Sequence, residues 1–276
     1  MFRLLFLRSK STLQSAAGLA AAVVVLLHSA SAQDVPERVF DAAQEAEIAR
    51  LIRTYLLENP EVIPEAIEIW RDRQEAEEKV RQKEAILAAW DELKDDGFSP
   101  VAGNPDGDVT VVEFYDYRCV FCRRAFPDLQ RLLKADTNIR YVLKQFPVRD
   151  QPGAPPVSLM AAKAVMAANR QGNFLDLHNA MMTTDTPLTE AQIFALARKH
   201  GFDEGELREG MQTPALHGAV EANFDLARRI GITGTPAYII GGELYMGVQP
   251  LERLFELVAQ ARAQASNEKT SSKEEG

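Results

Sequence analysis

The 276-residue chain has two cysteines, Cys119 and Cys122, and both belong to one C-x-x-C motif. A disulfide between residues so close in sequence closes a small loop, so it restrains little chain entropy and stabilises a fold only weakly. Two such thiols can instead exchange disulfides with other proteins, because a thiolate attacks a disulfide sulfur and forms a mixed disulfide. The pair therefore predicts redox chemistry rather than a structural cross-link.

The residues around the motif predict where these sulfurs lie. The run Val109–Tyr115 is β-branched and aromatic, which is typical of a central buried strand, and a helical pattern begins at the cysteines. Cys119 would then lie beside the unpaired N–H groups of a helix N-terminus, where negative charge is favoured. Such sites lower a cysteine pKa from about 8.5 to as low as about 3.5. We expect Cys119 to be the exposed attacking thiolate and Cys122 the resolving thiol.

The side chains next to the cysteines have expected roles of their own. Val120 and Phe121 offer no side-chain hydrogen bond to a thiolate, and we assign them to substrate binding. Arg118, Arg123 and Arg124 could favour the thiolate, although the simpler interpretation is a solvated helix start, because exposed charges act weakly.

The order of the remaining elements predicts an α/β fold. Strand, helix and strand form a βαβ unit, a helical insert follows at about 150–214, and the chain ends in helix, strand, strand and helix. The later predicted elements are a strand at 139–146, a helix at 215–230, strands at 237–240 and 243–246 joined by a Gly-Gly turn, and a helix at 251–264.

The first 32 residues have the features of a secretory signal peptide. A positively charged start precedes the apolar run 16–27, and Ala-Ser-Ala at 30–32 is a small-x-small cleavage signal. An uncleaved membrane anchor is the alternative. Export would place the protein in an oxidising compartment, which we take to be the periplasm. The net charge of −9 disfavours a nucleic-acid partner, since such proteins need a basic surface.

Residues 33–97 predict a helical arm with two helices, at 41–57 and at about 60–94. The second helix is apolar at its ends and polar in the middle, as in a solvated spacer. Its apolar ends need a partner, and we expect homo-oligomerisation through this arm, with folding back onto the catalytic domain as the alternative. The catalytic domain would span 98–264, with the Gly- and Pro-rich linker or turn region at 97–107 as the domain boundary. A disordered tail would follow at 265–276.

The stretch VVEFYDYRCVFC, together with GTP far downstream before a β-hairpin and a final helix, resembles the DsbA family over about residues 100–264. The resemblance implies a thioredoxin-like fold with an all-helical insertion. It also implies that Thr235 and Pro236 form a cis-proline loop that packs against the cysteines and helps hold substrate chains. Glu113 matches a buried acidic residue that assists proton movement in the family; a partly exposed strand glutamate is the alternative.

Two departures from DsbA bear on the activity. DsbA has Pro-His between its cysteines where this chain has Val120-Phe121, so a strongly oxidising potential is not implied. The arm at 33–97 resembles the N-terminal region of suppressor-of-copper-sensitivity proteins, some of which oligomerise into disulfide isomerases. Threonine before the cis-proline is also similar to the isomerases. The resemblance thus implies an oxidase or an isomerase, and an oligomer such as a trimer.

Taken together, the sequence predicts an exported thiol–disulfide oxidoreductase that forms or rearranges disulfides in cysteine-containing exported proteins. A membrane redox partner would reset the cysteine pair. We expect no organic cofactor, because the two sulfurs carry the electrons, and no metal site, because His178, His200 and His217 lack ligand spacing. The alternatives are a soft-metal (copper) binding protein, since thiolates select such ions, and a holdase-like chaperone that uses the same groove.

Overall fold

The computed structural model describes residues 39–274, with backbone only at 268–274. The chain divides into two compact units, the first ending at Pro64 and the second beginning at Glu65. The predicted signal peptide at 1–32 lies outside the described residues. Among residues 39–274, no helix combines the length and the apolar character that a bilayer crossing requires.

The described part of the first unit contains helix α1 (Ala42–Glu58), which matches the predicted helix. Asp41 caps its N-terminus: the Asp41 carboxylate accepts the Gln44 N–H at 2.9 Å, and the Gln44 side chain accepts the Asp41 N–H at 2.9 Å. Such a capping box satisfies two N–H groups that the helix leaves free. The helix buries no residue, and Leu51 and Tyr55 are exposed along it.

Helix α2 (Val62–Ala88) is polar over most of its length, and Ile86 is its one buried residue. It ends at Ala88, and a short helix α3 (Trp90–Lys94) follows after Ala89, so the single predicted helix to residue 94 is two helices. Ile86 and Leu93 are fully buried in a cluster with sheet residues. The end of the predicted arm is therefore part of the second compact unit, because its apolar face covers the sheet.

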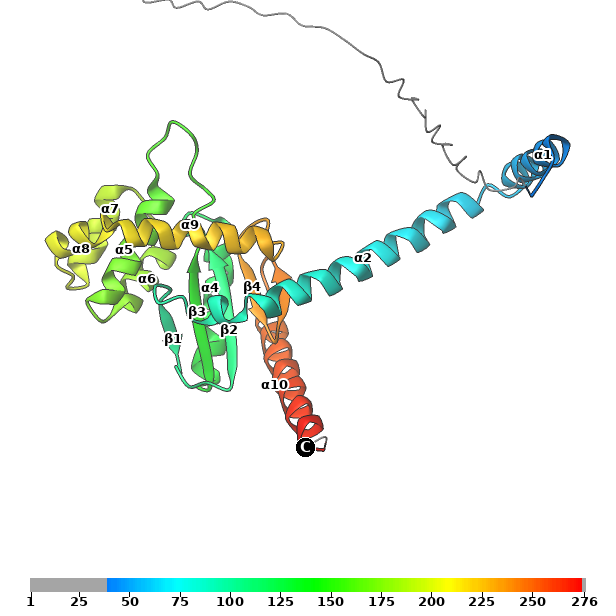
Figure 1. Cartoon of the computed structure of the whole chain (residues 1–276). Helices are drawn as coiled ribbons and strands as arrows, with labels where there is room; N and C mark the ends of the chain where they lie inside the picture. Colours follow the sequence, from blue (N-terminus) through cyan, green and yellow to red (C-terminus); the bar gives the residue numbers. More distant parts are fainter. Residues whose placement is uncertain (1–38, 275–276) are drawn as a thin grey trace, which may run out of the picture. The chain divides into compact units, whose positions relative to one another are not determined.

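The sheet has the strand order β1-β3-β2-β4-β5 (Figure 1). Strands β2 and β3 are parallel, and the pairs β1–β3, β2–β4 and β4–β5 are antiparallel. The strands are β1 (Val101–Gly103), β2 (Val109–Tyr115), β3 (Ile139–Gln145), β4 (Ala237–Ile240) and β5 (Glu243–Met246). The sequence prediction placed β1 in a linker, because three residues beside Gly and Pro give too short a pattern to read as a strand.

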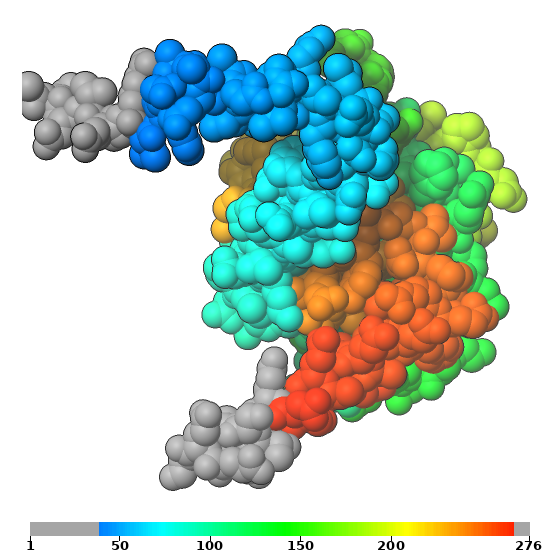
Figure 2. Space-filling model, turned by 90° about the vertical axis from the view of Figure 1, so that its right-hand side faces the viewer, coloured from blue at the N-terminus to red at the C-terminus, as the bar shows by residue number. Residues whose placement is uncertain are grey.

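Helices cover both faces of this sheet. On β2, Val111 and Tyr115 face one core cluster and Val112 and Phe114 face the other, as the strand period of two requires. Helices α4 (Val120–Ala135) and α10 (Leu251–Glu274) contribute to the first cluster, and α9 (Pro214–Arg229) with the end of α2 contributes to the second. Figure 1 shows α9 crossing the sheet, and Figure 2 shows α10 beside the β4–β5 hairpin.

A helical insertion separates β3 from α9, and the thioredoxin-like fold with an all-helical insertion is confirmed. Its helices are α5 (Val157–Arg170), α6 (Phe174–Thr183), α7 (Glu190–Lys199) and α8 (Glu204–Met211). The sequence predicts a disordered tail from residue 265, but in the structure α10 continues to Glu274. Residues 265–274 contain no Gly or Pro that would end a helix.

A buried ion pair ties α3 and the following loop to the sheet. The Lys144 ammonium on β3 is fully buried and donates to an Asp96 carboxylate oxygen and to the Glu92 carbonyl oxygen, both at 2.7 Å. Burial lowers the pKa of Lys144, and Asp96 opposes that effect. This pair fixes the connection that precedes β1.

Candidate redox site

The turn between β2 and α4 carries the cysteines. The buried Asp116 carboxylate accepts the N–H of Arg118 at 2.7 Å, the N–H of Arg149 at 2.8 Å and the Ser158 hydroxyl at 2.9 Å. The Asp116 carbonyl oxygen accepts the Cys119 N–H at 3.0 Å. These bonds join the turn, the loop after β3 and the start of α5, and they place Cys119 at the N-cap of α4.

The two sulfurs differ in their access to solvent. Cys119 is 5 % exposed and Cys122 is fully buried, and both are free thiols. The sequence prediction of an exposed Cys119 sulfur overstated its exposure, because the loop that carries Thr235 covers much of it. Cys119 is still the sulfur of the pair that an incoming disulfide can reach.

The pKa values of the two thiols are displaced in opposite directions. The pKa of Cys119 falls from 9.0 to about 5, chiefly because the Cys122 thiol donates a hydrogen bond to its sulfur. Burial opposes this fall, and hydrogen bonds from Thr235 and from the backbone N–H groups of Cys122 and Phe121 add to it. The first turn of the helix thus contributes as expected, but it is not the largest cause. Burial raises the pKa of Cys122 far above its usual range, and the Cys119 sulfur and Glu113 add to the rise.

The loop before β4 forms the other side of the site. The Thr235–Pro236 peptide bond is cis, as the resemblance implies. The Cys119 thiol donates to the Thr235 carbonyl oxygen at 3.3 Å. The Pro236 carbonyl oxygen accepts the Gly247 N–H at 2.8 Å, which ties this loop to the end of β5. The structure therefore brings Thr235 and Pro236 against Cys119, although they lie far apart in the sequence.

Glu113 lies inside the protein beneath the cysteines. It is buried on β2, and the Tyr141 hydroxyl donates to its carboxylate. Burial raises the pKa of Glu113 to about 7, opposed by the hydrogen bond from Tyr141. The alternative of a partly exposed strand glutamate is wrong. A carboxyl that titrates near neutrality close to Cys122 can exchange a proton at physiological pH.

The two residues between the cysteines face solvent. Val120 is 61 % exposed and Phe121 is 51 % exposed. The Arg124 guanidinium lies 5.7 Å from the centroid of the Phe121 ring, within range of a cation–π contact. An apolar patch therefore adjoins the one accessible sulfur.

A buried polar cluster that the sequence patterns did not predict lies beside the site. The Tyr117 hydroxyl forms hydrogen bonds of 2.9 Å with the Tyr115 hydroxyl and with His178 Nδ1. Burial lowers the pKa of His178 to about 3, so the ring is neutral. His178 Nε2 has no hydrogen-bond partner among the described residues. His178 lies four positions after Phe174 and three before Met181, at the helical period of the buried residues of α6, and this spacing indicates its burial.

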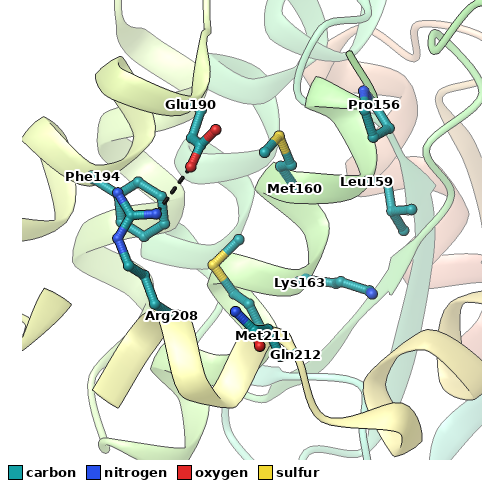
Figure 3. Close-up of a pocket in the computed structure, with 9 residues that line it drawn as sticks. All are labelled: Pro156, Leu159, Met160, Lys163, Glu190, Phe194, Arg208, Met211 and Gln212. Atoms are coloured by element: carbon teal, nitrogen blue, oxygen red, sulfur yellow. Dashed lines mark hydrogen bonds and ion pairs between the residues drawn. The ribbon is translucent and has the colours of Figure 1, made fainter. Parts of the chain in front are cut away.

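The structure also contains a pocket in the helical insertion that shares no residue with the cysteine site (Figure 3). Arg208 stacks over the Phe194 ring at 3.6 Å from its centroid and forms an ion pair of 2.9 Å with Glu190. Within residues 39–274, no group of three or more His, Cys, Asp or Glu residues could hold a metal ion.

Two family models match this chain. The model of the DSBA-like thioredoxin domain matches residues 110–259, which contain both cysteines and the cis-proline loop. The model of the copper resistance protein ScsC N-terminal domain matches residues 44–77, which include most of α1 and the first part of α2.

Solved structures and curated relatives show similar chains. A thioredoxin-like oxidoreductase from Silicibacter pomeroyi is 36% identical with a TM-score of 0.59, over 63% of this chain and 97% of that one. BcfH from Salmonella enterica Typhimurium is 27% identical with a TM-score of 0.67, over 80% of this chain and 96% of that one. The Na(+)/H(+) antiporter NhaA 3 of Salinispora tropica is 31% identical over 165 residues, or 60% of this chain. The match covers 25% of the antiporter, so this chain spans about a quarter of that relative's length.

Proposed function

The chain belongs to the DSBA-like thioredoxin domain family, and from that membership we propose that it is an exported protein thiol–disulfide oxidoreductase. One observation carries the proposal: Cys119 has a pKa of about 5 and keeps solvent access, while Cys122 is buried and protonated. At neutral pH Cys119 is thus a thiolate, which is the nucleophilic form of cysteine. The predicted signal peptide supports a periplasmic location.

The reaction begins when the Cys119 thiolate attacks a client disulfide. A bond forms between the Cys119 sulfur and one client sulfur, the client disulfide breaks, and the departing sulfur takes the electron pair and then a proton from water. The departing thiol can attack another disulfide of the client, which rearranges the client's pairing. Alternatively, Cys122 loses its proton and attacks the Cys119 sulfur. That step releases the client thiol and leaves a Cys119–Cys122 disulfide.

Glu113 is the proposed proton acceptor for Cys122. The Cys122 thiol cannot attack until it is deprotonated, and its pKa in the folded chain opposes that step. Glu113 is buried and has a pKa of about 7, so it can accept a proton near neutral pH. It also lies close to Cys122, because its charge is one of the causes of the raised Cys122 pKa. Thr235 and Pro236 would hold the client chain beside Cys119, and the exposed Val120 and Phe121 would contact its apolar side chains.

Whether the protein oxidises or rearranges client disulfides depends on whether its cysteine pair is kept oxidised or reduced. Stabilising the Cys119 thiolate stabilises the reduced pair, which makes the disulfide more oxidising. An oxidase needs a membrane partner to re-oxidise the pair, whereas an isomerase needs one to keep the pair reduced. The ScsC-like region at 44–77 and the threonine before Pro236 favour disulfide rearrangement as the main activity.

We further propose that the protein works as a homo-oligomer, such as a trimer, assembled through the segment predicted as an arm. The exposed apolar side chains of α1 support this proposal, because a helix that buries nothing in its own chain gains stability from a partner helix. Its apolar residues at positions 48, 51, 52 and 55 follow the helical period.

Insulin reduction and refolding of scrambled ribonuclease test the activity. The reduced wild-type chain should catalyse at least one of the two reactions, and Cys119→Ala should abolish it. Cys122→Ala should still form the mixed disulfide, but it should not release the client sulfur that is bonded to Cys119. Equal rates for the wild type and Cys119→Ala would contradict the proposal. Tight stoichiometric Cu(I) binding by the pair, with no thiol exchange, would favour the metal-binding alternative. Suppression of aggregation that survives loss of both cysteines would favour the chaperone.

A further inference from the structure

Three arginines adjoin the C-x-x-C motif: Arg118 precedes it, and Arg123 and Arg124 follow it. The Arg123 guanidinium is partly buried and donates to the Met182 carbonyl oxygen at 3.2 Å, so it joins α4 to α6. Arg118 and Arg124 are exposed, and Arg124 lies beside the apolar ring of Phe121.

A fourth arginine, Arg149, reaches this region from the loop after β3. Its backbone N–H donates to the Asp116 carboxylate at 2.8 Å, and the carbonyl oxygen of Asp116 accepts the Cys119 N–H at 3.0 Å. The side chain of Arg149 is exposed. In the part of the chain that the structure describes, neither Arg124 nor Arg149 has an ion-pair partner.

Acidic groups on the same elements pair with Arg118 alone and leave Arg124 and Arg149 without a counter-charge among the described residues. Asp116 is buried, and its two carboxylate oxygens already accept three hydrogen bonds. Asp150 forms an ion pair of 3.1 Å with Arg118 and also accepts the N–H groups of Ser158 and Leu159 at the start of α5. A positive surface thus borders Cys119 in a chain whose net charge is −9.

We propose that the arginine rim, defined as Arg118, Arg124 and Arg149, selects client segments whose cysteine is flanked by acidic and apolar residues. The inference rests on the proposed exchange function and names its substrate class. A local patch opposite in sign to the whole protein attracts acidic segments toward this one surface, while the remaining surface repels them. The exposed apolar Val120 and Phe121, which lie between Arg118 and Arg124 in the sequence, suit a polypeptide rather than a nucleic acid.

Three synthetic peptides test the proposal. Each has a single cysteine activated as a 2-pyridyl disulfide and flanked by leucine, and they differ only in having four Glu, four Gln or four Lys. When Cys119 attacks, its bond to the peptide sulfur forms as the peptide–pyridyl disulfide breaks. The pyridyl sulfur takes the electron pair and a proton from water, and the absorbance of pyridine-2-thione reports the rate under single-turnover conditions.

The reduced full chain should react at least fivefold faster with the Glu peptide than with the Lys peptide at about 20 mM salt, with the Gln peptide between them. The ratio should fall toward one at about 300 mM salt, because screening shortens the range of the charges. Arg124→Glu/Arg149→Glu should reverse or abolish the preference. A control of the same charge change is Lys134→Glu/Arg170→Glu, at the far ends of α4 and α5, which should keep it.

The ratio of the peptide rates isolates recognition from reactivity. The rim variant can raise the Cys119 pKa and slow all three peptides alike, and that change leaves the ratio untouched. Equal rates for the three wild-type reactions, or the same ratio in the rim variant and the control, would overturn the inference while leaving the exchange function intact. Failure of the exchange function gives a different result: no peptide would react faster than with free cysteine.

Discussion

The Cys119 sulfur lies 3.3 Å from the Thr235 carbonyl oxygen, although 116 positions separate the two residues in sequence. The contact exists because β2 and β4 are neighbours in the sheet, so the end of β2 and the start of β4 meet at one edge. The reactive sulfur is thus held between the first turn of α4 and the loop that precedes β4.

The ionisation of Cys119 should depend on its neighbour. Thiolate absorbance at 240 nm in the reduced protein should rise with a midpoint near pH 5, and Cys119→Ala should lack this step. Cys122→Ala removes the largest cause of the lowered pKa, so the midpoint should move upward while the backbone N–H groups keep it below 9.0. Cys122→Ser retains a donor and should move it less. An unchanged midpoint in Cys122→Ala would exclude this hydrogen bond as the main cause.

The same group should make stability depend on pH. The folded pKa of Cys119 lies below its ordinary value, so its stabilising contribution to the reduced protein is complete above about pH 9 and is lost as the pH falls through about 5. The free energy of unfolding of Cys119→Ala, from urea titrations at several pH values, should lack this part of the pH dependence. Parallel curves for the two proteins would contradict the assignment.

Glu113→Gln should separate stability from activity. The folded pKa of Glu113 is raised to about 7, so its contribution is complete below about pH 4.5 and is lost as the pH rises through 7. The glutamine variant should therefore be more stable than the wild type at pH 8, by up to about 3 kcal/mol, and similar to it at pH 4.5. Resolution of the mixed disulfide should slow by about 100-fold, because a general base is lost.

Glu221→Gln is the matched control for that variant, since this glutamate is exposed on α9. It should change neither the pH dependence of stability nor the rate of resolution. If Glu113→Gln resolves mixed disulfides at the wild-type rate, Glu113 is not the group that accepts the Cys122 proton.

The buried pair of Lys144 and Asp96 should be important for stability. Asp96→Asn leaves a buried ammonium without its counter-charge, and we expect a loss of about 3 kcal/mol in urea unfolding. The double variant Lys144→Met/Asp96→Asn should lose less than the sum of the single changes, because no unpaired charge remains. Lys94→Met breaks an exposed pair with Asp91 and should cost at most about 1 kcal/mol. Additive losses would show that the pair does not act as a unit.

His178 should contribute to acid sensitivity. Its folded pKa is lowered to about 3, so its contribution is complete above about pH 6.5 and is lost as the pH falls toward 3. His178→Gln keeps a polar partner for Tyr117 but cannot ionise, so its acid-unfolding midpoint, followed by circular dichroism, should move to lower pH. His217→Gln changes an exposed histidine and should leave the midpoint where it is.

The oligomer should depend on the apolar face of α1. Leu51→Glu/Tyr55→Glu places charges among its exposed apolar side chains, and light scattering should then report a monomer. The thermal midpoint of the catalytic unit should stay within a few degrees of the wild type, because neither side chain is buried in the chain itself. Arg53→Glu, a charge change elsewhere on α1, should leave the assembly intact. A monomeric wild-type chain would refute the proposal directly.

The sequence was sufficient to predict the central sheet elements and the placement of both cysteines. A strand with continuous apolar residues followed by a helix leaves few alternatives for Cys119, and Thr235–Pro236 could be placed through the resemblance. Two features depended on long-range packing and could not be predicted in this way. The exposure of Cys119 is set by a loop 116 positions away, and the burial of Leu93 is set by the sheet that it covers.

Shorter or isolated signals account for the other differences. Strand β1 has three residues, too few for a period of two to be visible in the sequence. Ligand spacing shows His178 only as one of three scattered histidines, because its hydrogen-bond partner Tyr117 lies 61 positions away in the sequence. Its role became visible only when the fold placed it beside Tyr117.

Because the two thiols are buried to different extents, the number of thiols that react with a reagent depends on whether the chain is folded and whether it is reduced. A bulky thiol reagent should label one sulfur in the folded, reduced protein and two after denaturation, because Cys122 has no accessible surface until the first turn of α4 opens. The oxidised protein should give none in either condition. Counting labelled sulfurs by mass spectrometry would therefore report both folding and redox state from one sample, even inside intact cells.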